Sequence, residues 1–564
     1  MQPAYLHGRG LVSALGPDLP AALACLKSDG VEPGRLKVGP ATVWPYFAIA
    51  NDDLDWYART RRLTLQAVAE CGVVDRAAPL FLASCSLDVG AMEDGAPWPP
   101  DCQGFAETVA GWLDWHGPVY WISTACTSAS NALLSAVSCL RAGEASAALV
   151  LGMEVRNRFT SAGFGAMQLL DSQRPRPLAA DRAGLVLGEA VAALYLSTTP
   201  ARWRVCGGAN VVDGSDPAGA TPQAVAAMYT AALADSGLRP DDIGLIKLQA
   251  AGSPGNDANE LAGLHRAFAS VPALTSLKAE IGHTLGASGA AELALLTACL
   301  EHGVWPVPRN PADPDLDAAL ANEIPVVPYL ANTILGFGGG HATLVLEDCA
   351  RSPGSGISSA SGLHPSGPQQ KTPRVPRSWR IAGRCFTAPP PADWRERLAT
   401  RLGFKPRRIG RWAELALYGA LCCLDDAGET TLPAGALLSL ASLLGPDQAL
   451  RTALHEAQDG LPMPMGFLQS QPNQALAHLA KALDWQGNAR CLTTREPLTA
   501  LHLACANAGS AGVLLGWVAE GGDGCSQWLR LVPMASGDYA PLPASLEALA
   551  DPAWAGFCLN YATD

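Results

Sequence analysis

The stretch Tyr120-Trp121-Ile122-Ser123-Thr124-Ala125-Cys126-Thr127-Ser128-Ala129-Ser130-Asn131 runs from an apolar strand through a turn of small residues into a helix. Cys126 lies at the junction. A thiol at a helix start faces the positive end of the helix dipole and unpaired N–H groups, which lower its pKa and favour the thiolate. A buried structural cysteine is the competing interpretation, because free cysteines are among the most buried residues. The rest of the chain decides between the two.

The composition of the 564-residue chain is that of a large folded protein with more than one domain. Hydrophobic residues make up 49% and charged residues 16%, which excludes disorder as its general character. The net charge of -13 and the pI near 5.3 argue against nucleic acid or an acidic membrane surface as a general partner. An acidic carrier protein would need a local basic patch.

The cysteine pattern and the absence of long apolar runs indicate the cellular compartment. Sixteen cysteines are scattered without repeated CxxC or metal-ligand spacing, so we expect reduced thiols and no metal site. The first five residues lack a basic region followed by an apolar run, and no apolar stretch reaches the ~18 residues that span a bilayer. The sequence predicts a cytoplasmic protein without a transmembrane segment.

The chain divides into two folded regions. Over residues 1–349, apolar strands at 80–84, 119–123, 147–152 and 191–196 alternate with helical patterns such as 131–141 and 222–235, which indicates an α/β fold. Residues 350–376 are rich in Ser, Gly, Pro and Gln and are predicted to be a linker. Residues 377–564 are predicted to form a smaller α/β domain.

The second region resembles a degenerate copy of part of the first. The sequence LDWHG at 113–117 returns as LDWQG at 483–487, after an amphipathic helix in both places. The matching order and spacing favour duplication over chance. Extending the match without gaps sets Cys126 against Glu496, and an earlier gap would make the counterpart Thr494 or Arg495. The copy is expected to end after Gly516 and to contain no nucleophilic cysteine.

Four further segments of the first region accompany TACTS at 124–128. They are DRAGLVLGEA at 181–190, AGSPGND at 251–257, LKAEIGHTLGASGAAE at 277–292, and a glycine-rich turn at 336–341 that can aim backbone N–H groups at an oxyanion. In this order, they resemble the β-ketoacyl-acyl carrier protein synthases of the thiolase superfamily. The resemblance covers about residues 5–347, and the C-terminal region resembles only the N-terminal half of such a synthase.

The resemblance implies a five-layered αβαβα fold, followed by a smaller α/β domain like half of it. It also implies a two-step reaction: an acyl group moves from a carrier-protein phosphopantetheine to Cys126, and a decarboxylated malonyl unit then attacks the thioester. No cofactor is expected beyond that carrier-bound phosphopantetheine. The expected partners are acyl carrier protein and, in a homodimer or heterodimer, another ketosynthase.

The resemblance also assigns roles to individual residues. Cys126 is the expected nucleophile, because a thiolate both attacks a thioester and leaves again. His283 would stabilise the enolate with the support of Lys278. The N–H groups of Cys126 and Phe337 would form the oxyanion hole. The expected supporting residues are Glu292, Asp257, Glu260 and Gly338, and the expected acyl-pocket residues are Phe164, Met167 and Leu169.

One departure from the family pattern bears on the activity. Family members read His-Gly-Thr-x-Thr-Pro where this chain reads Ala251-Gly252-Ser253-Pro254, so Ala251 replaces the first catalytic histidine in a loop that is two residues shorter. Losing such a group costs about 10² to 10⁴ in rate. Three replacements for the missing histidine remain open: His341, His283 acting alone, or a partner subunit.

Two functions follow from these features. The first is an acyltransferase of fatty-acid, polyketide or polyene biosynthesis with 3-oxoacyl-[acyl-carrier-protein] synthase-like chemistry, in which transfer is better supported than condensation. The alternative is a non-elongating partner subunit similar to a chain-length factor. Glu496 is similar to the Gln substitution of such factors, but a surface residue at a helix start, which the helix dipole favours, is the preferred interpretation. The tail is expected to be non-catalytic and to pack against a synthase domain.

Overall fold

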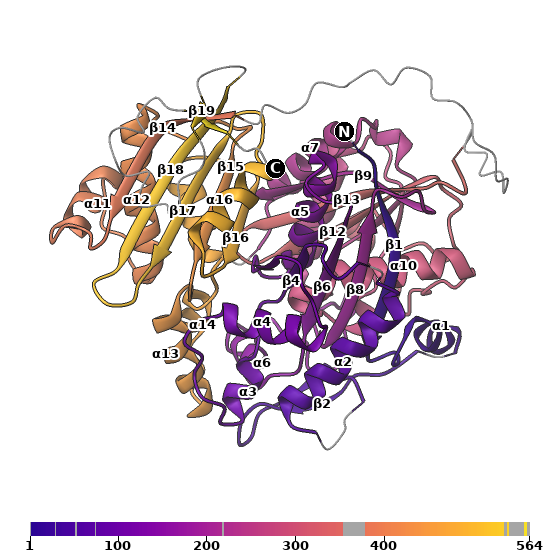
Figure 1. Cartoon of the computed structure of the whole chain (residues 1–564). Coiled ribbons are helices and arrows are strands. Elements are labelled where there is room, and N and C mark those ends of the chain that lie inside the picture. Colours follow the sequence, from indigo (N-terminus) through magenta and orange to yellow (C-terminus); the bar gives the residue numbers. More distant parts are fainter. Residues whose placement is uncertain are drawn as a thin grey trace, which may run out of the picture.

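The computed structural model describes residues 2–28, 30–50, 54–73, 75–216, 219–352, 378–534, 539–540 and 558–560 (Figure 1). Most of the predicted linker therefore lies outside the described residues. The predicted strands of the first region are confirmed as β4 (Leu80–Ala83), β5 (Val119–Ile122), β6 (Ala147–Glu154) and β8 (Ala190–Ser197), and the predicted helices are parts of α5 (Ser128–Ala142) and α7 (Pro222–Ser236). No helix in the described ranges is long and apolar enough to cross a membrane.

Two large five-stranded arrays form the core of the first region. In one sheet, the order β1–β8–β6–β4–β5 joins β1 (Ala4–Ser13), β8 (Ala190–Ser197), β6 (Ala147–Glu154), β4 (Leu80–Ala83) and β5 (Val119–Ile122). In the other, the order β9–β13–β12–β10–β11 joins β9 (Trp203–Val212), β13 (Gly340–Asp348), β12 (Tyr329–Gly336), β10 (Leu245–Lys247) and β11 (Ala273–Thr275).

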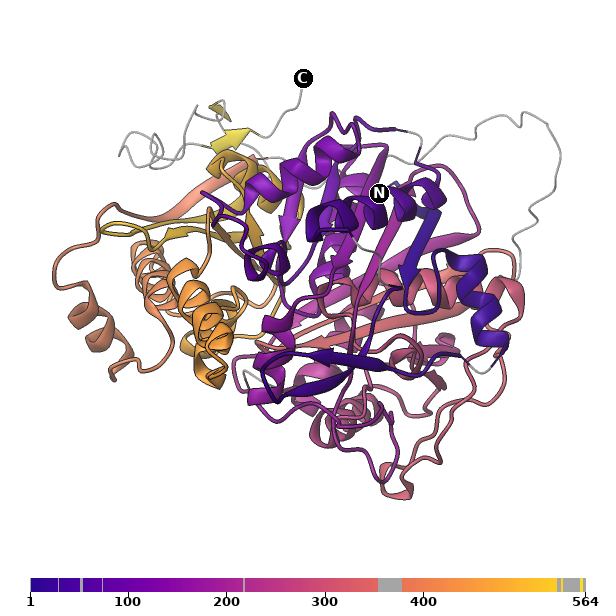
Figure 2. The same cartoon turned by 90° about the horizontal axis from the view of Figure 1, so that it is seen from below.

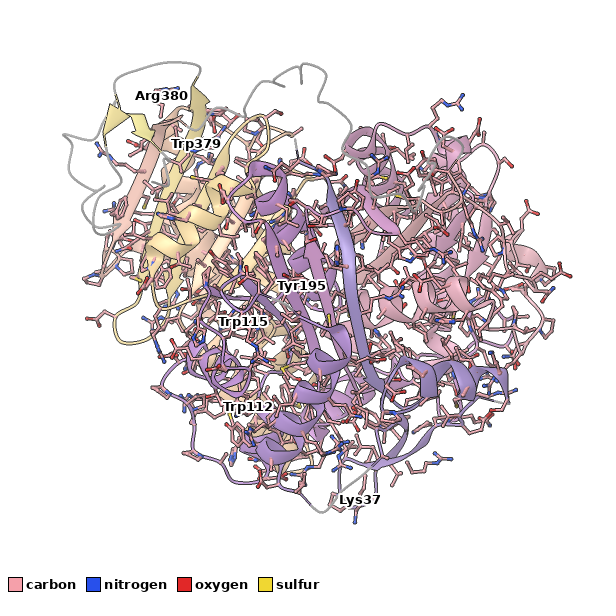
Figure 3. All side chains as sticks on the ribbon, turned by 45° about the vertical axis from the view of Figure 1, so that its right-hand side comes forward. Lys37, Trp112, Trp115, Tyr195, Trp379 and Arg380 are labelled. Carbon is pink, nitrogen blue, oxygen red and sulfur yellow. The ribbon has the colours of Figure 1, made fainter. Side chains whose placement is uncertain are left out.

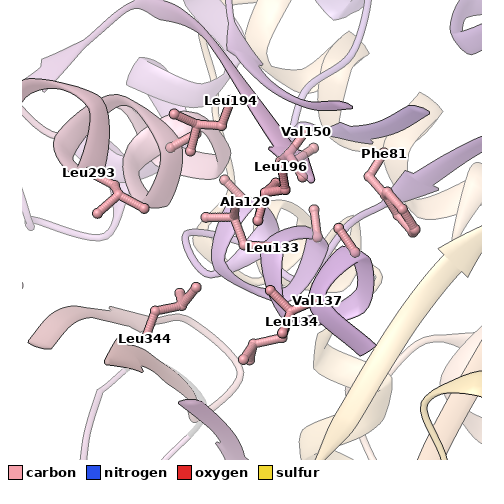
Figure 4. Packing of buried hydrophobic residues seen from close by; sticks show 14 of the residues in the cluster. Phe81, Ala129, Leu133, Leu134, Val137, Val150, Leu194, Leu196, Leu293 and Leu344 are labelled. Carbon is pink, nitrogen blue, oxygen red and sulfur yellow. The ribbon is translucent and has the colours of Figure 1, made fainter. Parts of the chain in front are cut away.

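Helices fill the space between the sheets and cover their outer faces. The central layer is α5 (Ser128–Ala142) and α10 (Ser288–His302), both buried on nearly every side, as expected for helices that are apolar all round. Figure 4 shows Leu133 and Val137 of α5 between Leu194 of one sheet and Leu344 of the other. The outer layers are α2 (Trp56–Cys71) with α4 (Gln103–Trp112), and α7 (Pro222–Ser236) with α8 (Pro254–Ala267). The result is the five-layered αβαβα fold.

Shorter elements surround the ends of these layers. A three-stranded sheet joins β2 (Gly34–Lys37), β3 (Val43–Phe47) and β7 (Leu187–Gly188). The short helices of the first region are α1 (Leu19–Lys27), α3 (Val89–Glu93), α6 (Arg158–Ala166) and α9 (Lys278–Ile281).

The C-terminal region repeats the first sheet. Its strand order is β14–β18–β17–β15–β16. The first two pairs are antiparallel and the last two are parallel, as in β1–β8–β6–β4–β5. The strands are β14 (Ser378–Thr387), β15 (Leu437–Ser442), β16 (Ala489–Thr493), β17 (Val513–Ala519) and β18 (Cys525–Met534). The expectation that the copy ends after Gly516 is wrong, because β17 and β18 continue the repeated pairing beyond it.

The helices of the C-terminal region complete the copy. They are α11 (Trp394–Leu402), α12 (Arg411–Ala427), α13 (Asp447–Gln458), α14 (Pro464–Gln469), α15 (Gln474–Ala482) and α16 (Pro497–Ala506). The short β19 (Tyr539–Ala540) and β20 (Cys558–Asn560) pair at the β14 edge. In Figure 1, α13 and α14 lie beside α6 of the first region, and these helices are in contact.

The repeated pentapeptide adopts the same conformation in both copies. Asp114 and Asp484 both have a left-handed φ, of 51° and 46°. The indole of Trp115, labelled in Figure 3, donates to Ala78 O at 2.8 Å, and the indole of Trp485 donates to Pro433 O at 3.2 Å. A shared unusual φ together with a shared indole contact identifies these as equivalent positions.

The two regions join edge to edge. β5 pairs antiparallel with β16, with Ile122 opposite Leu492 and Trp121 opposite Thr493, and the C-terminal region lies alongside the first in Figure 2. Arg495 reinforces the junction by binding Asp101 at 2.7 Å and Glu107 at 2.6 Å. The C-terminal region thus packs against the first region of its own chain.

Candidate active site

Cys126 lies in the turn between β5 and α5, directly before the helix-capping residue Thr127. Ala125 has a left-handed φ of 52°, a conformation that the surrounding structure must hold in place. Ser128 holds it, because its Oγ donates to Ala125 O at 2.6 Å and accepts from Thr124 N at 2.9 Å. The thiol is therefore fixed in position, with only 4% of the residue exposed.

The imidazole of His283 contacts this thiol. His283 Nε2 lies 3.0 Å from Cys126 Sγ, and Nδ1 lies 3.1 Å from Lys278 Nζ. Lys278 Nζ also donates to Ser288 Oγ at 3.0 Å. An ammonium group only donates, so Nδ1 accepts, and the hydrogen-bond network assigns the ring proton to Nε2. His283 thus presents an N–H to the sulfur and does not act as the base that removes the thiol proton.

Glu292 stands between two buried lysines. One carboxylate oxygen accepts from Lys278, and the other accepts from Lys247 at 2.6 Å, whose Nζ also donates to Thr333 O at 2.7 Å. All three charged side chains are fully buried. Two cations therefore share one carboxylate, and the uncompensated positive charge behind His283 favours negative charge developing in front of it.

The resting thiol and imidazole are both neutral. Burial raises the pKa of the Cys126 thiol to about 11, while Lys278 and the backbone N–H of Phe337 act in the opposite direction. The expectation that the helix start lowers this pKa is therefore wrong for the resting site, because desolvation outweighs the favourable dipoles. The pKa of His283 is far below its usual value, first because of burial and then because of Lys278 and Lys247.

The glycine-rich turn between β12 and β13 lies beside the thiol. The backbone N–H groups of Phe337 and of Cys126 itself both act to lower the pKa of the thiol, so the two expected oxyanion donors lie near the same atom. Gly338 has a φ of 73°, and a Cβ there would lie 2.2 Å from Asn473 Nδ2. Asn473, from the C-terminal region, donates to Phe337 O and is 4% exposed. The second copy therefore supports this turn directly.

Asp257 and Glu260 hold the loop that departs from the family pattern. The carboxylate of Asp257 accepts from the backbone N–H groups of Ala251 and Gly252, both at 3.1 Å. Glu260 accepts from Gln249 N at 2.7 Å and Ala250 N at 2.8 Å. Burial raises the pKa of Asp257 to about 6 and that of Glu260 to about 7. Every carboxylate oxygen is used by the backbone, which is a positioning role.

Two cavities meet at the thiol. The larger, about 840 Å³, is lined by both regions of the chain, and the smaller, about 470 Å³, contains His283 and Ala251. Cys126, Phe164 and Phe337 line both. The rings of Phe164 and Phe337 stack with centroids 4.9 Å apart. Cys126 thus borders two cavities that share a stacked aromatic pair.

The structure places the remaining predicted residues less favourably. Phe164 lines the cavities as expected, but Met167 and Leu169 are half-buried against the adjoining cluster and are not among the lining residues. The strand alternation of β13 turns Gly340 towards Thr127 and His341 towards the outer helix layer. His341 is therefore not placed to replace the missing imidazole at Cys126.

Counted from the paired residues Ile122 and Leu492, Glu496 matches Cys126, whereas counted from the helix N-caps Thr127 and Glu496 the match is Arg495. Glu496 precedes α16 as its N-cap residue, is exposed, and makes no side-chain cap bond. The surface interpretation of Glu496 therefore fits the structure, and a role in chain-length control has no support at this position.

Three residues that approach the site were missed by sequence reasoning: Lys247, Gln249 and Asn473. Lys247 and Gln249 are polar residues two positions apart in an otherwise apolar buried segment, a pattern that places both on one face and that was available in the sequence. Asn473 carries no such signal, because its contact with Phe337 depends on the packing of the two regions. Within the described ranges, no group of His, Cys, Asp and Glu side chains is arranged to hold a metal ion.

The fold is thiolase-like. It has the αβαβα layers, and a cysteine lies at a strand-to-helix turn with an imidazole beside it. Residues 100–201 match the model for the β-ketoacyl synthase N-terminal domain, and residues 205–311 match that for the C-terminal domain. Residues 100–311 of the chain are thus similar to both halves of a β-ketoacyl synthase.

The relatives include a nodulation protein and a subunit of a polyketide synthase. Nodulation protein E of Rhizobium sp. (strain N33) is 30% identical over 222 residues, which are 37% of this chain and 55% of that protein. The tetracenomycin polyketide synthase ketoacyl synthase alpha subunit of Streptomyces glaucescens is 31% identical over 261 residues, covering 41% and 60%. The chain thus spans little more than half the length of these relatives.

Solved structures extend the likeness of the fold to the C-terminal region. The PfaC keto synthase-chain length factor covers 94% of this chain and 78% of its own, with a TM-score of 0.71 and 14% identity. The ketosynthase ApeO in complex with its chain length factor ApeC, from Xenorhabdus doucetiae, covers 62% of this chain and 98% of its own, with a TM-score of 0.55 and 23% identity.

Proposed function

We propose that the chain is a β-ketoacyl synthase-like acyltransferase of fatty-acid, polyketide or polyene biosynthesis that uses Cys126 as its nucleophile. The observation that carries the proposal is the continuous contact from Cys126 through His283 to Lys278, with the thiol open to two cavities. A purely structural cysteine has no need of this arrangement. No cofactor takes part, and both substrates arrive on the phosphopantetheine of acyl carrier protein.

In the first step, Cys126 Sγ attacks the carbonyl carbon of an acyl thioester and loses its proton as the new C–S bond forms. The oxyanion lies between the N–H groups of Cys126 and Phe337. The carbon–sulfur bond to the carrier then breaks, and the departing thiolate takes up the proton. The high thiol pKa in the resting site means that substrate binding and the oxyanion donors must supply the driving force.

In the second step, an acceptor thioester enters the smaller cavity. His283 Nε2 donates to its carbonyl oxygen and stabilises the enolate that forms when a malonyl unit loses CO₂. The carbanion attacks the Cys126 thioester, and the cysteine leaves as a thiolate. The positive charge shared by Lys278 and Lys247 favours the enolate. Because Ala251 provides no imidazole, we propose that transfer to and from Cys126 is faster than condensation.

The C-terminal region supplies one wall of the larger cavity, which suits it to hold the acyl chain. Leu444, Leu450 and Phe467 of this region face Met92 and Phe159 of the first. Since β16 already occupies the edge of β5, a second ketosynthase subunit cannot extend the sheet there. We propose that the tail takes that place within one chain, and that acyl carrier protein is the transient partner.

A non-elongating, chain-length-factor-like subunit remains the second candidate. It is favoured by Ala251, which leaves His283 as the single imidazole among the described residues of the smaller cavity. Such a subunit would bind an active synthase and shape its pocket without forming an acyl-enzyme.

Mass spectrometry of the intact protein tests the proposal. Wild type and Cys126→Ala are incubated with acyl-carrier and malonyl-carrier proteins, alone and with a candidate synthase. Cys126-dependent acylation without extension supports transfer, and extension refutes the non-elongating candidate. Absence of acylation in every mixture would overturn the enzyme proposal.

A further inference from the structure

A basic segment lies on the surface of the C-terminal region, between α11 and α12. It consists of Lys405, Arg407 and Arg408, and all three residues are exposed. Residues 403–413 contain no Asp or Glu, although the chain as a whole has a net charge of -13. The basic segment is therefore a local exception to the charge of the protein.

The basic segment differs from the helix before it in its lack of carboxylate partners. No described side chain forms an ion pair or a hydrogen bond with Lys405, Arg407 or Arg408. The positive charge of the segment is thus directed to the solvent. The arginines of α11 are each neutralised: Arg395 by Glu414 at 2.8 Å, Arg397 by Asp393 at 2.9 Å and Arg401 by Asp425 at 2.9 Å.

The repeat shows that the fold does not require positive charge at this position. The helices α2 and α12 are equivalent, because each has a buried tryptophan near its start, Trp56 or Trp412, and ends at a left-handed glycine the same distance further on. Counted back from these tryptophans, the first copy has Asn51-Asp52 where the C-terminal copy has Arg407-Arg408. The charge is therefore a feature of the C-terminal copy alone.

The basic segment lies next to the wall of the larger cavity. Ile409 and Gly410, the two residues that follow it, line a cavity of about 250 Å³ together with Pro446 and Gln471. Pro446 and Gln471 also line the larger cavity, whose wall includes Cys126. A partner that binds the basic segment therefore stands beside the cavity that contains the nucleophile.

We infer that the basic segment is a docking surface for an acidic acyl carrier protein, which it holds beside the larger cavity. The inference rests on the proposed function, in which both substrates arrive on such a carrier. Opposite charges steer two proteins together and fix their orientation. A small acidic protein can contact the basic segment alone, whereas a nucleic acid or an anionic membrane would extend over the acidic remainder of the surface. The C-terminal copy thus brings the carrier to the thiol of the first copy.

Binding of a carrier without its prosthetic arm tests this surface separately from the active site. In the Cys126→Ala background, the Kd of bacterial apo-acyl carrier proteins is measured by fluorescence anisotropy. Arg407→Glu/Arg408→Glu is expected to weaken binding about tenfold at low salt, and added salt should weaken the parent protein more than this variant. Arg407→Lys/Arg408→Lys keeps the charge and should bind within about threefold of the parent protein.

The matched control is Lys27→Glu/Arg266→Glu, which changes the net charge equally at two exposed residues of the first region. It should change the Kd by less than about twofold. An equal loss in the two Glu variants would overturn the inference, because binding would then follow net charge alone. Absence of carrier binding would also overturn it, as would binding of phosphatidylserine vesicles or duplex DNA in place of the carrier. Because no acyl-enzyme forms in this background, docking and the proposed acylation of wild type can fail separately.

Discussion

Ile122 and Leu492 face each other in neighbouring antiparallel strands, and they occupy the same position in the two copies of the repeated sheet. A residue that pairs with its own counterpart lies on a two-fold axis. The chain therefore folds as an internal dimer of one complete unit and one half unit.

Removing the C-terminal region should expose the edge of β5 and one wall of the larger cavity. A chain ending at residue 352 is expected to self-associate or aggregate and to lose acylation, because an open strand edge pairs with other chains. Light scattering and intact-mass acylation measure both effects. Unchanged solubility, oligomeric state and activity would contradict the proposed role of the tail.

A charge placed on the two-fold axis gives a milder test. Leu492→Asp buries an unpaired carboxylate opposite Ile122 and should lower the free energy of unfolding by about 3–5 kcal/mol. Val326→Asp is the control, since Val326 is 77% exposed. Similar denaturation midpoints for the two variants would argue against a buried junction.

Asn473 should affect the chemistry of a thiol it does not touch. Asn473→Leu removes the hydrogen bond to Phe337 O, so the oxyanion N–H loses its alignment, and the acylation rate should fall about tenfold or more. Thioester affinity should change little. Gln103→Leu, at the equivalent helix start of the first copy, provides the comparison. A selective loss of affinity in Asn473→Leu would point to a cavity effect instead.

Phe467 should limit the length of the acyl chain. Its ring packs so closely against Gly163 that a Cβ at that position would lie 2.3 Å from the ring. The centroids of the Phe467 and Phe159 rings are 5.3 Å apart. Phe467→Ala should shift the acylation preference to longer chains and cost about 3–5 kcal/mol of stability. Phe404→Ala, at a residue 62% exposed, should change neither. An unaltered chain-length profile in Phe467→Ala would place the acyl chain elsewhere.

The alkylation of Cys126 should depend steeply on pH. With a pKa of about 11, its thiolate fraction and its rate with iodoacetamide should rise about tenfold per pH unit between 7 and 10. The neighbouring Cys385 thiol lowers the pKa of Cys422 to about 7, so the rate at Cys422 should level off above pH 8. Peptide mass spectrometry follows both sites. A plateau for Cys126 near pH 8 would show that its thiolate is already stabilised.

Glu292 should be needed to hold its two lysines. Glu292→Gln leaves two buried ammonium groups without their carboxylate and should lower the free energy of unfolding by about 3–5 kcal/mol. Adding Lys247→Met removes one of these charges and should recover part of the loss. If the double variant were less stable than Glu292→Gln alone, the loss of stability would not come from two unpaired lysine charges at this position.

Much of the site was available in the sequence because its parts are local. The strand, turn and helix around Cys126 follow from apolar residues that give way to small ones, and Lys278, His283 and Glu292 lie within one short segment. The repeated pentapeptide likewise marked the copy, since its turn is a local conformation. The end of the copy was missed because β17 and β18 are recognised by their pairing partners.

The tertiary structure alone decided which charges meet and how the thiol titrates. Lys247 reaches Glu292 only because β10 and α10 pack together, and Asn473 reaches Phe337 only because β16 joins β5. The helix start suggested a lowered pKa for Cys126, but burial raises it. The sequence by itself indicated the resemblance to the β-ketoacyl synthases and singled out Cys126 and His283 as candidate site residues. Desolvation and long-range contacts, which depend on the assembled layers, determined the electrostatics of these two residues.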